Sequence, residues 1–262
     1  MYRIACVGDN CVDSYDRTGE IFFGGNPVNA AVYAIRLGLA ASYLGAVGTD
    51  RFGLEMLTAL SEKGIDVSHA QILEGNTALT HVSIENGERV FGKYDEGVMK
   101  NFMLREEDYT FLAGHDLAVT GLWGHCENSL GRIRSLGIPV VFDSSDRTEA
   151  PESVLARKST DIFFFSDDKS GDQKLRNKLQ RLSSEGPGLV IATRGDKGSL
   201  AWDGERFVAQ GIIPVQIADT MGAGDSFIAG CAAAWLEGRP LPECMLSGAK
   251  SSAVTLQYPG AW

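Results

Sequence analysis

The stretch IADTMGAGDSFIAGCAAAW, residues Ile217–Trp235, places small residues, one carboxylate and one hydroxyl between a strand-like run and a helical run. The preceding IIPVQI predicts a strand and the following SFIAGCAAAW predicts a helix. Gly222, Ala223 and Gly224 then fall at the first turn of that helix, where backbone N–H groups lack partners and the helix dipole is positive. Without bulky side chains an anion can approach these groups closely, so the sequence predicts an anion site.

Asp225 directly follows this turn, where its negative charge repels the anion. A carboxylate at such a position therefore indicates a chemical role. We infer a general base, which removes a proton from a hydroxyl as that hydroxyl attacks a phosphorus atom held over the turn. Asp219, just before the turn, is placed to help organise a cation. Two alternatives stay open: Asp225 only caps the helix, or Ser226 is the nucleophile of a serine hydrolase, although no histidine stands out as its partner.

The composition limits the partners and the compartment. The chain has 262 residues with 24 basic and 34 acidic side chains, a net charge of −10 that disfavours nucleic acid and anionic membranes as partners. The five cysteines form no CxxC pair, which is typical of free thiols in a reducing compartment. The opening MYRIACVGDN has no export pattern, so we expect a cytoplasmic protein.

Strand-like and helical segments alternate along the chain, which predicts βαβ units and a mostly parallel sheet. The strand-like runs are IACVG (4–8), ASYLGAVG (41–48), LAVTG (117–121), IPVVFD (138–143), DIFFF (161–165) and LVIAT (189–193). Asn26 is expected to cap one helix that ends at Gly38, and Asp50 to cap another. Residues 77–94 instead predict a hairpin around Asn86 and Gly87, a candidate lid or an ordinary edge hairpin.

Two motifs carry a family resemblance. DTMGAGDSFIAG resembles the C-terminal signature of the ribokinase, or PfkB-type, sugar and nucleoside kinases, and GGNPVNAA (Gly24–Ala31) resembles their other signature. FD, TRGDKG and PGA follow in the family's order, so the resemblance covers essentially the whole chain. It implies a ribokinase-like α/β fold with helices on both faces of the sheet. It also implies a single domain, 1–262, with a β lid inserted at about 77–97 and contributions from residues near 10–24.

The resemblance also implies roles for individual residues. Asp225 becomes the catalytic base, and Gly222, Ala223 and Gly224 line the anion hole. Asp13 matches an aspartate that binds sugar hydroxyls, a task that suits a carboxylate because it accepts two hydrogen bonds at once. The substrate positions are Asp9, Asn10, Asp13, Gly24, Gly25, Asn26 and Asn29, and the nucleotide positions are Thr193, Gly195, Gly198, Thr220, Gly222 and Gly224. The implied cofactors are ATP and Mg²⁺, and a monovalent cation such as K⁺ is a further candidate.

The sequence departs from the family where an Asn-x-x-Glu motif is usual. Ser166 and Lys169 stand at those positions, which leaves Asp167 (or its neighbour Asp168) and Asp219 as candidate magnesium ligands. The family's FDPNxR likewise appears here as FDSSDR, with Ser145 in place of asparagine.

The acceptor is suggested by GDNCVD, RVFGKYDEGVM, WGH and QYPGAW, which resemble the bacterial fructoselysine-kinase subgroup. That resemblance implies transfer to the 6-hydroxyl of a fructosyl amino acid, whose amine and carboxylate need charged or aromatic contacts. Arg89, Tyr94, Glu96 and Trp123 are candidates, although a solvated hairpin edge for Arg89 and core packing for Trp123 are slightly favoured over substrate contact. A kinase for fructose, ribose or a nucleoside stays open, as does a non-catalytic sugar-binding regulatory protein. The family resemblance also implies a homodimer through the lid.

Overall fold

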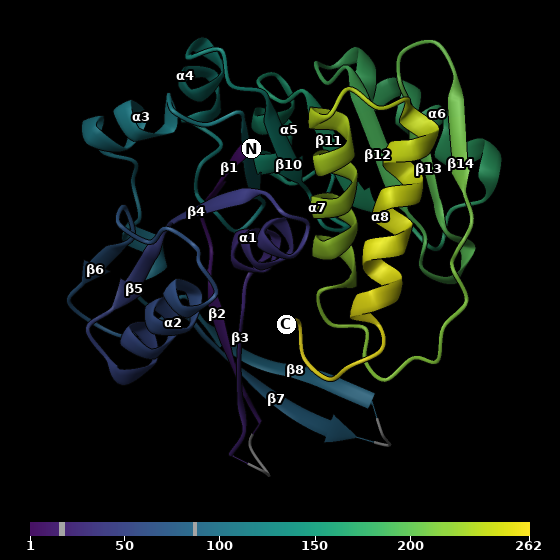
Figure 1. Ribbon diagram of the computed structural model, residues 1–262. Coiled ribbons are helices and arrows are strands. Elements are labelled where there is room, and N and C mark those ends of the chain that lie inside the picture. Colours follow the sequence, from purple (N-terminus) through teal and green to yellow (C-terminus); the bar gives the residue numbers. More distant parts are fainter. Residues whose placement is uncertain (16–18, 86–87) are drawn as a thin grey trace.

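The computed structural model describes residues 1–15, 19–85 and 88–262, and shows a central sheet between two layers of helices (Figure 1). The strands lie in the order β14-β13-β12-β11-β10-β9-β1-β4. Six of them are parallel: β1 (Arg3–Val7), β4 (Ala40–Leu44), β9 (Leu117–Gly121), β10 (Val140–Asp143), β11 (Ile162–Ser166) and β12 (Leu189–Thr193). β13 (Ser199–Trp202) and β14 (Phe207–Gln210) add an antiparallel edge. The mostly parallel sheet predicted from the alternating runs is confirmed.

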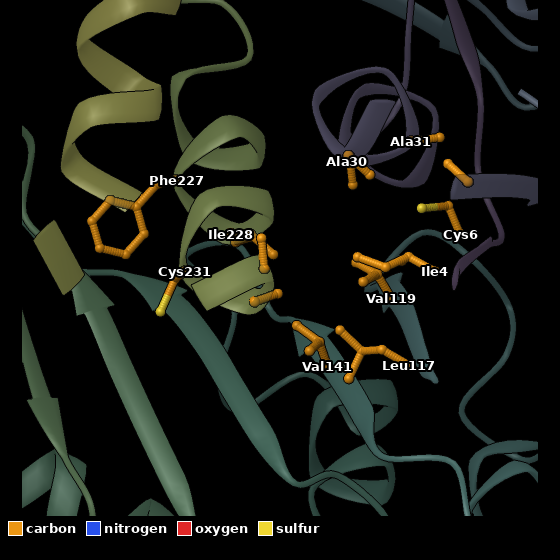
Figure 2. Packing of buried hydrophobic residues seen from close by; sticks show 14 of the residues in the cluster. Ile4, Cys6, Ala30, Ala31, Leu117, Val119, Val141, Phe227, Ile228 and Cys231 are labelled. Carbon is orange, nitrogen blue, oxygen red and sulfur yellow. The ribbon is translucent and has the colours of Figure 1, made fainter. Parts of the chain in front are cut away.

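The helices cover both faces because the parallel strands are apolar on both sides, as in LAVTG of β9, which is buried throughout. One layer contains α1 (Asn26–Arg36), α2 (Arg51–Glu62), α7 (Ala223–Leu236) and α8 (Leu241–Thr255). The other contains α3 (Glu106–Leu112), α4 (Leu130–Ser135), α5 (Pro151–Arg157) and α6 (Asp172–Ser184). Figure 2 shows part of the first core, where side chains of α1 and α7 gather over β1, β9 and β10. None of the helices in the described ranges combines the length and the apolar character needed to cross a membrane.

The start of α2 follows the sequence prediction and the start of α1 does not. Asp50 caps α2 by accepting a hydrogen bond from the backbone N–H of Gly53 at 3.0 Å. In α1, Asn26 is the first helical residue rather than the cap, because Gly25 occupies the cap position with a φ of 109°. The Asn26 side chain is therefore free to point away from the helix, and its contacts belong to the site described below.

A second sheet follows directly from the carboxyl end of β1. It has the order β3-β2-β7-β8 and comprises β2 (Cys11–Tyr15), β3 (Ile21–Gly24), β7 (Leu79–Glu85) and β8 (Glu88–Asp95). The predicted hairpin strands thus pair as β7 and β8, while the turn residues Asn86 and Gly87 lie outside the described residues. This small sheet extends from one end of the main body in Figure 1.

Four short elements complete the fold. β5 (Ala46–Gly48) and β6 (Gln71–Leu73) form a parallel pair, and 3-10 helices occupy Gly97–Asn101 (η1) and Gly195–Lys197 (η2). The strand predicted at IIPVQI is wrong: residues 211–217 have no regular structure. Much of this run is exposed, including Ile212 and Ile217, so no neighbouring layer stabilises it as a strand.

Candidate active site

A cavity of about 350 Å³ lies where the carboxyl ends of β1, β9 and β10 meet the start of α7. Parallel strands bring the residues that follow them to one edge of the sheet, which is the usual place for a ligand site in an α/β fold. The lining residues are Asp9, Asp13, Gly25, Asn26, Asn29, Leu122, Trp123, Asp143, Ser145, Met221, Gly222 and Asp225. Segments up to 216 residues apart in the sequence, from Asp9 to Asp225, therefore share one small space.

Asp225 lies in the first turn of α7 and is held by two amides. Its Oδ1 accepts a hydrogen bond from Asn26 Nδ2 at 2.7 Å, and its Oδ2 accepts one from Asn29 Nδ2 at 2.6 Å. Both asparagines belong to α1, which packs beside α7. The GGNPVNAA segment and the GAGD segment thus meet at one carboxylate, although the contacts span 199 and 196 residues of sequence.

Asn26 links Asp225 to two further carboxylates. Its Nδ2 also donates to Asp143 Oδ2 at 2.8 Å, and its backbone N–H donates to Asp9 Oδ2 at 3.1 Å. Gly25 makes this approach possible, because a Cβ at that position would lie 2.6 Å from Asn10 Cα. The left-handed φ of 109° is also one that glycine adopts readily.

These carboxyl groups have an unusually high affinity for protons. Burial raises the pKa of Asp225 to about 7; the Asn29 amide opposes this shift and the charges of Asp143 and Asp9 add to it. Burial also raises the pKa of Asp9 to about 6, although the hydrogen bond from the Asn26 N–H lowers it. Burial raises the pKa of Asp143 to about 6 as well, although the hydrogen bond from the Ser145 N–H lowers it. A carboxyl that titrates near neutral pH can take a proton from a hydroxyl and release it again, so Asp225 is suited to general-base chemistry.

The turn before Asp225 is built to bring an anion close. Gly222 caps α7 with a φ of 72°, and helix geometry leaves the first N–H groups of α7 without intrahelical acceptors. A Cβ on Gly224 would meet nothing within 4 Å, so this part of the turn is open. Ser226, by contrast, is fully buried and its hydroxyl donates to the Ala223 carbonyl at 3.0 Å, which argues against a serine nucleophile.

Three of the predicted nucleotide residues lie at the end of β12, at the same edge of the sheet, and the other three lie at the turn that leads into α7. Thr193 ends β12, where its hydroxyl lies 3.0 Å from that of Ser166. Gly195 opens the single turn η2, and Gly198 follows it with a φ of 77°; a Cβ on Gly198 would lie 2.1 Å from the Gln210 carbonyl oxygen. Thr220 precedes the anion turn and accepts a hydrogen bond from the Ala223 N–H through its carbonyl.

The two candidate metal ligands already have protein partners. Asp167 accepts hydrogen bonds from the backbone and the hydroxyl of Ser170 and pairs with Lys178 at 3.2 Å. These contacts outweigh its partial burial and hold its pKa below the ordinary value. Asp219 accepts from the backbone N–H groups of Met221 and Gly260. No group of three or more His, Cys, Asp or Glu side chains within the described residues could hold a metal ion.

The predicted acceptor contacts are only partly gathered at the cavity. Trp123 lines it with 43% of its surface exposed, and the Arg147 guanidinium lies 5.2 Å from its ring centroid. Glu96 pairs with His125, two residues beyond Trp123. Tyr94 is 41% exposed on β8 and does not line the cavity, and the side chain of Arg89 lies outside the described residues.

Neither Asn10 nor Gly24 lines the cavity. The Asn10 amide donates to Tyr43 Oη at 2.8 Å and to the Ala46 carbonyl at 2.6 Å, so it ties the connection between β1 and β2 to β4 and β5. Gly24 ends β3, and a Cβ there would lie 3.6 Å from Asn29 Oδ1. The structure therefore places both residues behind Asn29 and Gly25 rather than in the cavity wall.

Sequence reasoning missed four lining residues: Leu122, Asp143, Ser145 and Met221. Asp143 carried a usable signal, since it is the polar last residue of the otherwise apolar β10 and must lie at the carboxyl edge of the sheet. Ser145 stands where the family's FDPNxR has asparagine, which marks the position but assigns it no role. Leu122 and Met221 carried no signal, because their side chains have no distinctive chemistry.

Comparisons with known proteins show the family to which the chain belongs. The family model "pfkB family carbohydrate kinase" matches residues 1–262. The fructoselysine 6-kinase of Escherichia coli (strain K12) is 42% identical over 262 residues, with 100% of both chains covered. The fructosamine kinase of Bacillus subtilis (strain 168) is 31% identical over 264 residues, covering 99% of this chain and 93% of its own.

The fold also has a close counterpart among solved structures. The Arabidopsis thaliana ribokinase complexed with ribose and ATP superposes with a TM-score of 0.91 at 21% identity, covering 99% of this chain and 93% of that one. This likeness establishes a ribokinase-like fold, as the two sequence signatures predicted. The chain therefore belongs to the pfkB family of carbohydrate kinases, and is a sugar kinase that transfers a phosphoryl group to an alcohol acceptor.

Proposed function

We propose that this kinase transfers the γ-phosphoryl group of ATP to the 6-hydroxyl of a fructosyl amino acid such as fructoselysine, with Asp225 as general base. The observation that carries the proposal is the position of Asp225. It directly follows an open anion turn, lies in a cavity lined by other carboxylates, and has a pKa raised by burial to about 7.

In the proposed reaction, an ionised Asp225 oxygen accepts the proton of the acceptor hydroxyl as that oxygen attacks the γ-phosphorus. The bond from the γ-phosphorus to the β–γ bridging oxygen breaks, and ADP leaves. The N–H groups at the start of α7, around Gly222 and Gly224, stabilise the negative charge on the transferred group. The proton remains on Asp225 until the site opens to water.

Asp9 and Asp13 are proposed to bind the hydroxyl groups of the sugar. Both carboxylates are buried at the cavity wall, and Asp9 Oδ1 has no hydrogen-bond partner within the described residues. An unsatisfied buried oxygen is costly, and a sugar hydroxyl would remove that cost by donating to it. Carboxylates at this depth thus favour a polyhydroxylated acceptor over an apolar one.

The fructosyl amino acid is preferred over a simple sugar for two reasons. The 42% identity to the fructoselysine 6-kinases extends over the entire chain. The cavity is also bordered by Trp123 with Arg147 at its ring, and the Glu96–His125 pair lies nearby, which supplies charges of both signs. An acceptor with an amine and a carboxylate can use both charges, whereas fructose or ribose cannot.

Kinases of this family use ATP and typically Mg²⁺. The residues present fit a polyphosphate, since the anion turn lies at the same sheet edge as Arg194, whose Nε is buried without a partner within the described residues. Among the described residues there is no dedicated metal cluster, so we propose that Mg²⁺ is held mainly by the ATP phosphates, with K⁺ as a further candidate ion. The ion supplies charge neutralisation at the phosphates when it is bound.

We also propose a cytoplasmic enzyme that pairs through the small sheet. All five cysteines are free thiols, which suits a reducing compartment. β8 is the outer strand of the β3-β2-β7-β8 sheet and its residues 92–95 are exposed, so its edge is available for pairing with a second copy. Light scattering that gives the mass of a single chain at micromolar concentration would exclude this dimer.

The test is ADP release from Mg²⁺-ATP with five acceptors: fructoselysine, a second fructosyl amino acid, fructose, ribose and adenosine. We expect turnover confined to the fructosyl amino acids, and expect Asp225→Asn to lower kcat by about 10²- to 10⁴-fold with little change in the affinity for ATP. Asp203→Asn, in the turn between β13 and β14, is the matched control and should retain full turnover.

Each other outcome has a definite meaning. Preference for fructose, ribose or adenosine would overturn the acceptor and leave the base assignment intact. Near-normal turnover by Asp225→Asn would overturn the base assignment. Binding of fructosyl amino acids without any ADP release would instead support a non-catalytic sugar-binding protein.

A further inference from the structure

The segment Gly260–Trp262 touches three separate parts of the site. The Gly260 N–H donates to Asp219 Oδ2 at 2.7 Å, next to the anion turn. Ala261 packs against Gly222 so closely that a Cβ on Gly222 would lie 3.0 Å from the Ala261 Cβ. Trp262 Nε1 donates to Asn29 Oδ1 at 2.9 Å. In Figure 1 this end of the chain lies between α1 and the small sheet.

The indole of Trp262 is held in place from several sides. Its ring stacks on Phe23 of β3 with centroids 6.5 Å apart, and the Lys63 ammonium lies 4.8 Å from its centroid. The preceding carbonyl, that of Ala261, accepts a hydrogen bond from the hydroxyl of Tyr33 in α1. The indole N–H is therefore presented to Asn29 by a side chain with little freedom to rotate.

An indole N–H can only donate, and this determines the orientation of the Asn29 amide. The Asn29 atom that faces Trp262 must be the oxygen, so the NH₂ group faces Asp225. If Asp225 were protonated, its carboxyl could pair with either end of the amide. The Trp262 contact favours the orientation that donates to Asp225, which is the one that stabilises the ionised carboxylate.

Resting on the base assignment of the proposed function, we propose that Trp262 is a positioning residue for the phosphoryl transfer. Its indole N–H fixes the Asn29 amide so that the amide donates to Asp225 and keeps the base ionised. Trp262 touches neither the acceptor nor ATP in this scheme and acts only through Asn29.

The charged surroundings of Asp225 determine the sign of the effect. The charges of Asp143 and Asp9 oppose ionisation of Asp225, Asp13 lines the same cavity, and the Arg147 guanidinium lies at the ring of Trp123 in the cavity wall. Asn26 and Asn29 provide the donors that oppose this repulsion. Weakening the Asn29 contact must therefore raise the pKa of Asp225.

The test is Trp262→Phe, which removes the N–H and keeps an aromatic ring for Phe23. We expect an about twofold lower kcat at pH 7, an unchanged KM for ATP, and an acid limb of the kcat–pH profile displaced upward by about half a pH unit. The deficit should shrink above pH 8.5. The control Trp235→Phe, at the far end of α7, should match the parent in both respects.

Two further variants make the result decisive. A β-(3-benzothienyl)alanine at position 262 replaces the N–H by sulfur in nearly the same shape, so it reports on the hydrogen bond even if Trp262→Phe folds poorly. In an Asn29→Ala background, Trp262→Phe should have no additional effect on kcat. An unshifted acid limb in both position-262 variants, or effects of positions 29 and 262 that multiply, would overturn the proposal.

The base assignment is tested separately by Asp225→Asn in the same assay. If Asp225→Asn abolishes turnover while the position-262 variants behave like the parent, only the role of Trp262 is wrong. If Asp225→Asn stays active, the proposed function fails at the base, and the role of Trp262 fails with it.

Discussion

Asp225 is surrounded by three other carboxylates, and this predicts how the activity depends on pH. Burial raises its pKa to about 7, and a general base works only when it is ionised. We expect kcat/KM to be half-maximal near pH 7 and to fall about tenfold for each pH unit below about 6.5. Stopped assays between pH 5 and 9 would measure this limb. A limb near pH 4 would show that the kinetically important group is an ordinary exposed carboxyl.

Asn26 joins Asp225 to Asp143 through one amide nitrogen, so it is a second sensitive residue. Asn26→Ala removes a donor from both carboxylates at once, which should raise both pKa values. We expect turnover at pH 7 to fall about tenfold to a hundredfold, with partial recovery at pH 8.5. Kinetics across pH measure this, with the exposed Asn128→Ala as control. Equal losses at pH 7 and 8.5 would indicate a purely structural role.

At the scale of elements, Asp50 couples α2 to the start of the small sheet. Its carboxylate caps α2 through Gly53 and also accepts from the backbone and hydroxyl of Thr77, two residues before β7. We expect Asp50→Ala to lower the free energy of unfolding by about 2 kcal/mol, the sum of a lost cap and a lost buried contact. Urea titrations would measure it. Glu55→Ala, which breaks an exposed pair with Arg51, should leave the midpoint of the urea titration essentially unchanged.

The elements themselves were predictable where the signals are local. The apolar runs predicted the parallel strands, and Asp50 was recognised as a cap because capping depends on a few neighbouring residues. IIPVQI failed because an apolar run becomes a strand only beside a partner strand. Asn26 was expected to cap α1, but Gly25 does so and the amide instead binds carboxylates 117 and 199 residues away.

The site was therefore predictable by motif and not by geometry. The two signatures identified Asp225, Asn26 and Asn29 as site residues, but nothing local shows that they hydrogen-bond to one another. Trp262 ends the QYPGAW motif, but it is 233 residues from Asn29 and nothing in its own segment assigns it a partner, so only the folded chain reveals their contact.

At the scale of the whole molecule, the raised carboxyl pKa values affect stability. Asp9 and Asp143 titrate at about 6 and Asp225 at about 7 in the folded state, against 3.8 for an ordinary Asp. Their contribution to stability is fully present below pH 3.8 and is lost as the pH rises through these folded values. The free energy of unfolding of the parent should fall between pH 5.5 and pH 8. In Asp225→Asn this fall should be smaller by about 1 kcal/mol or more. Identical pH dependences for the parent and the variant would contradict it.

The buried position of Asp225 beside the anion turn also couples nucleotide binding to proton uptake. With a pKa of about 7, Asp225 carries a proton in roughly half of the free molecules at neutral pH. A polyanion that docks on the neighbouring turn raises this proton affinity further, so binding of ATP must draw protons from the solution. The heat of ATP binding at pH 7 will then change with the ionisation enthalpy of the buffer, and the slope will count the protons taken up before any phosphoryl group moves.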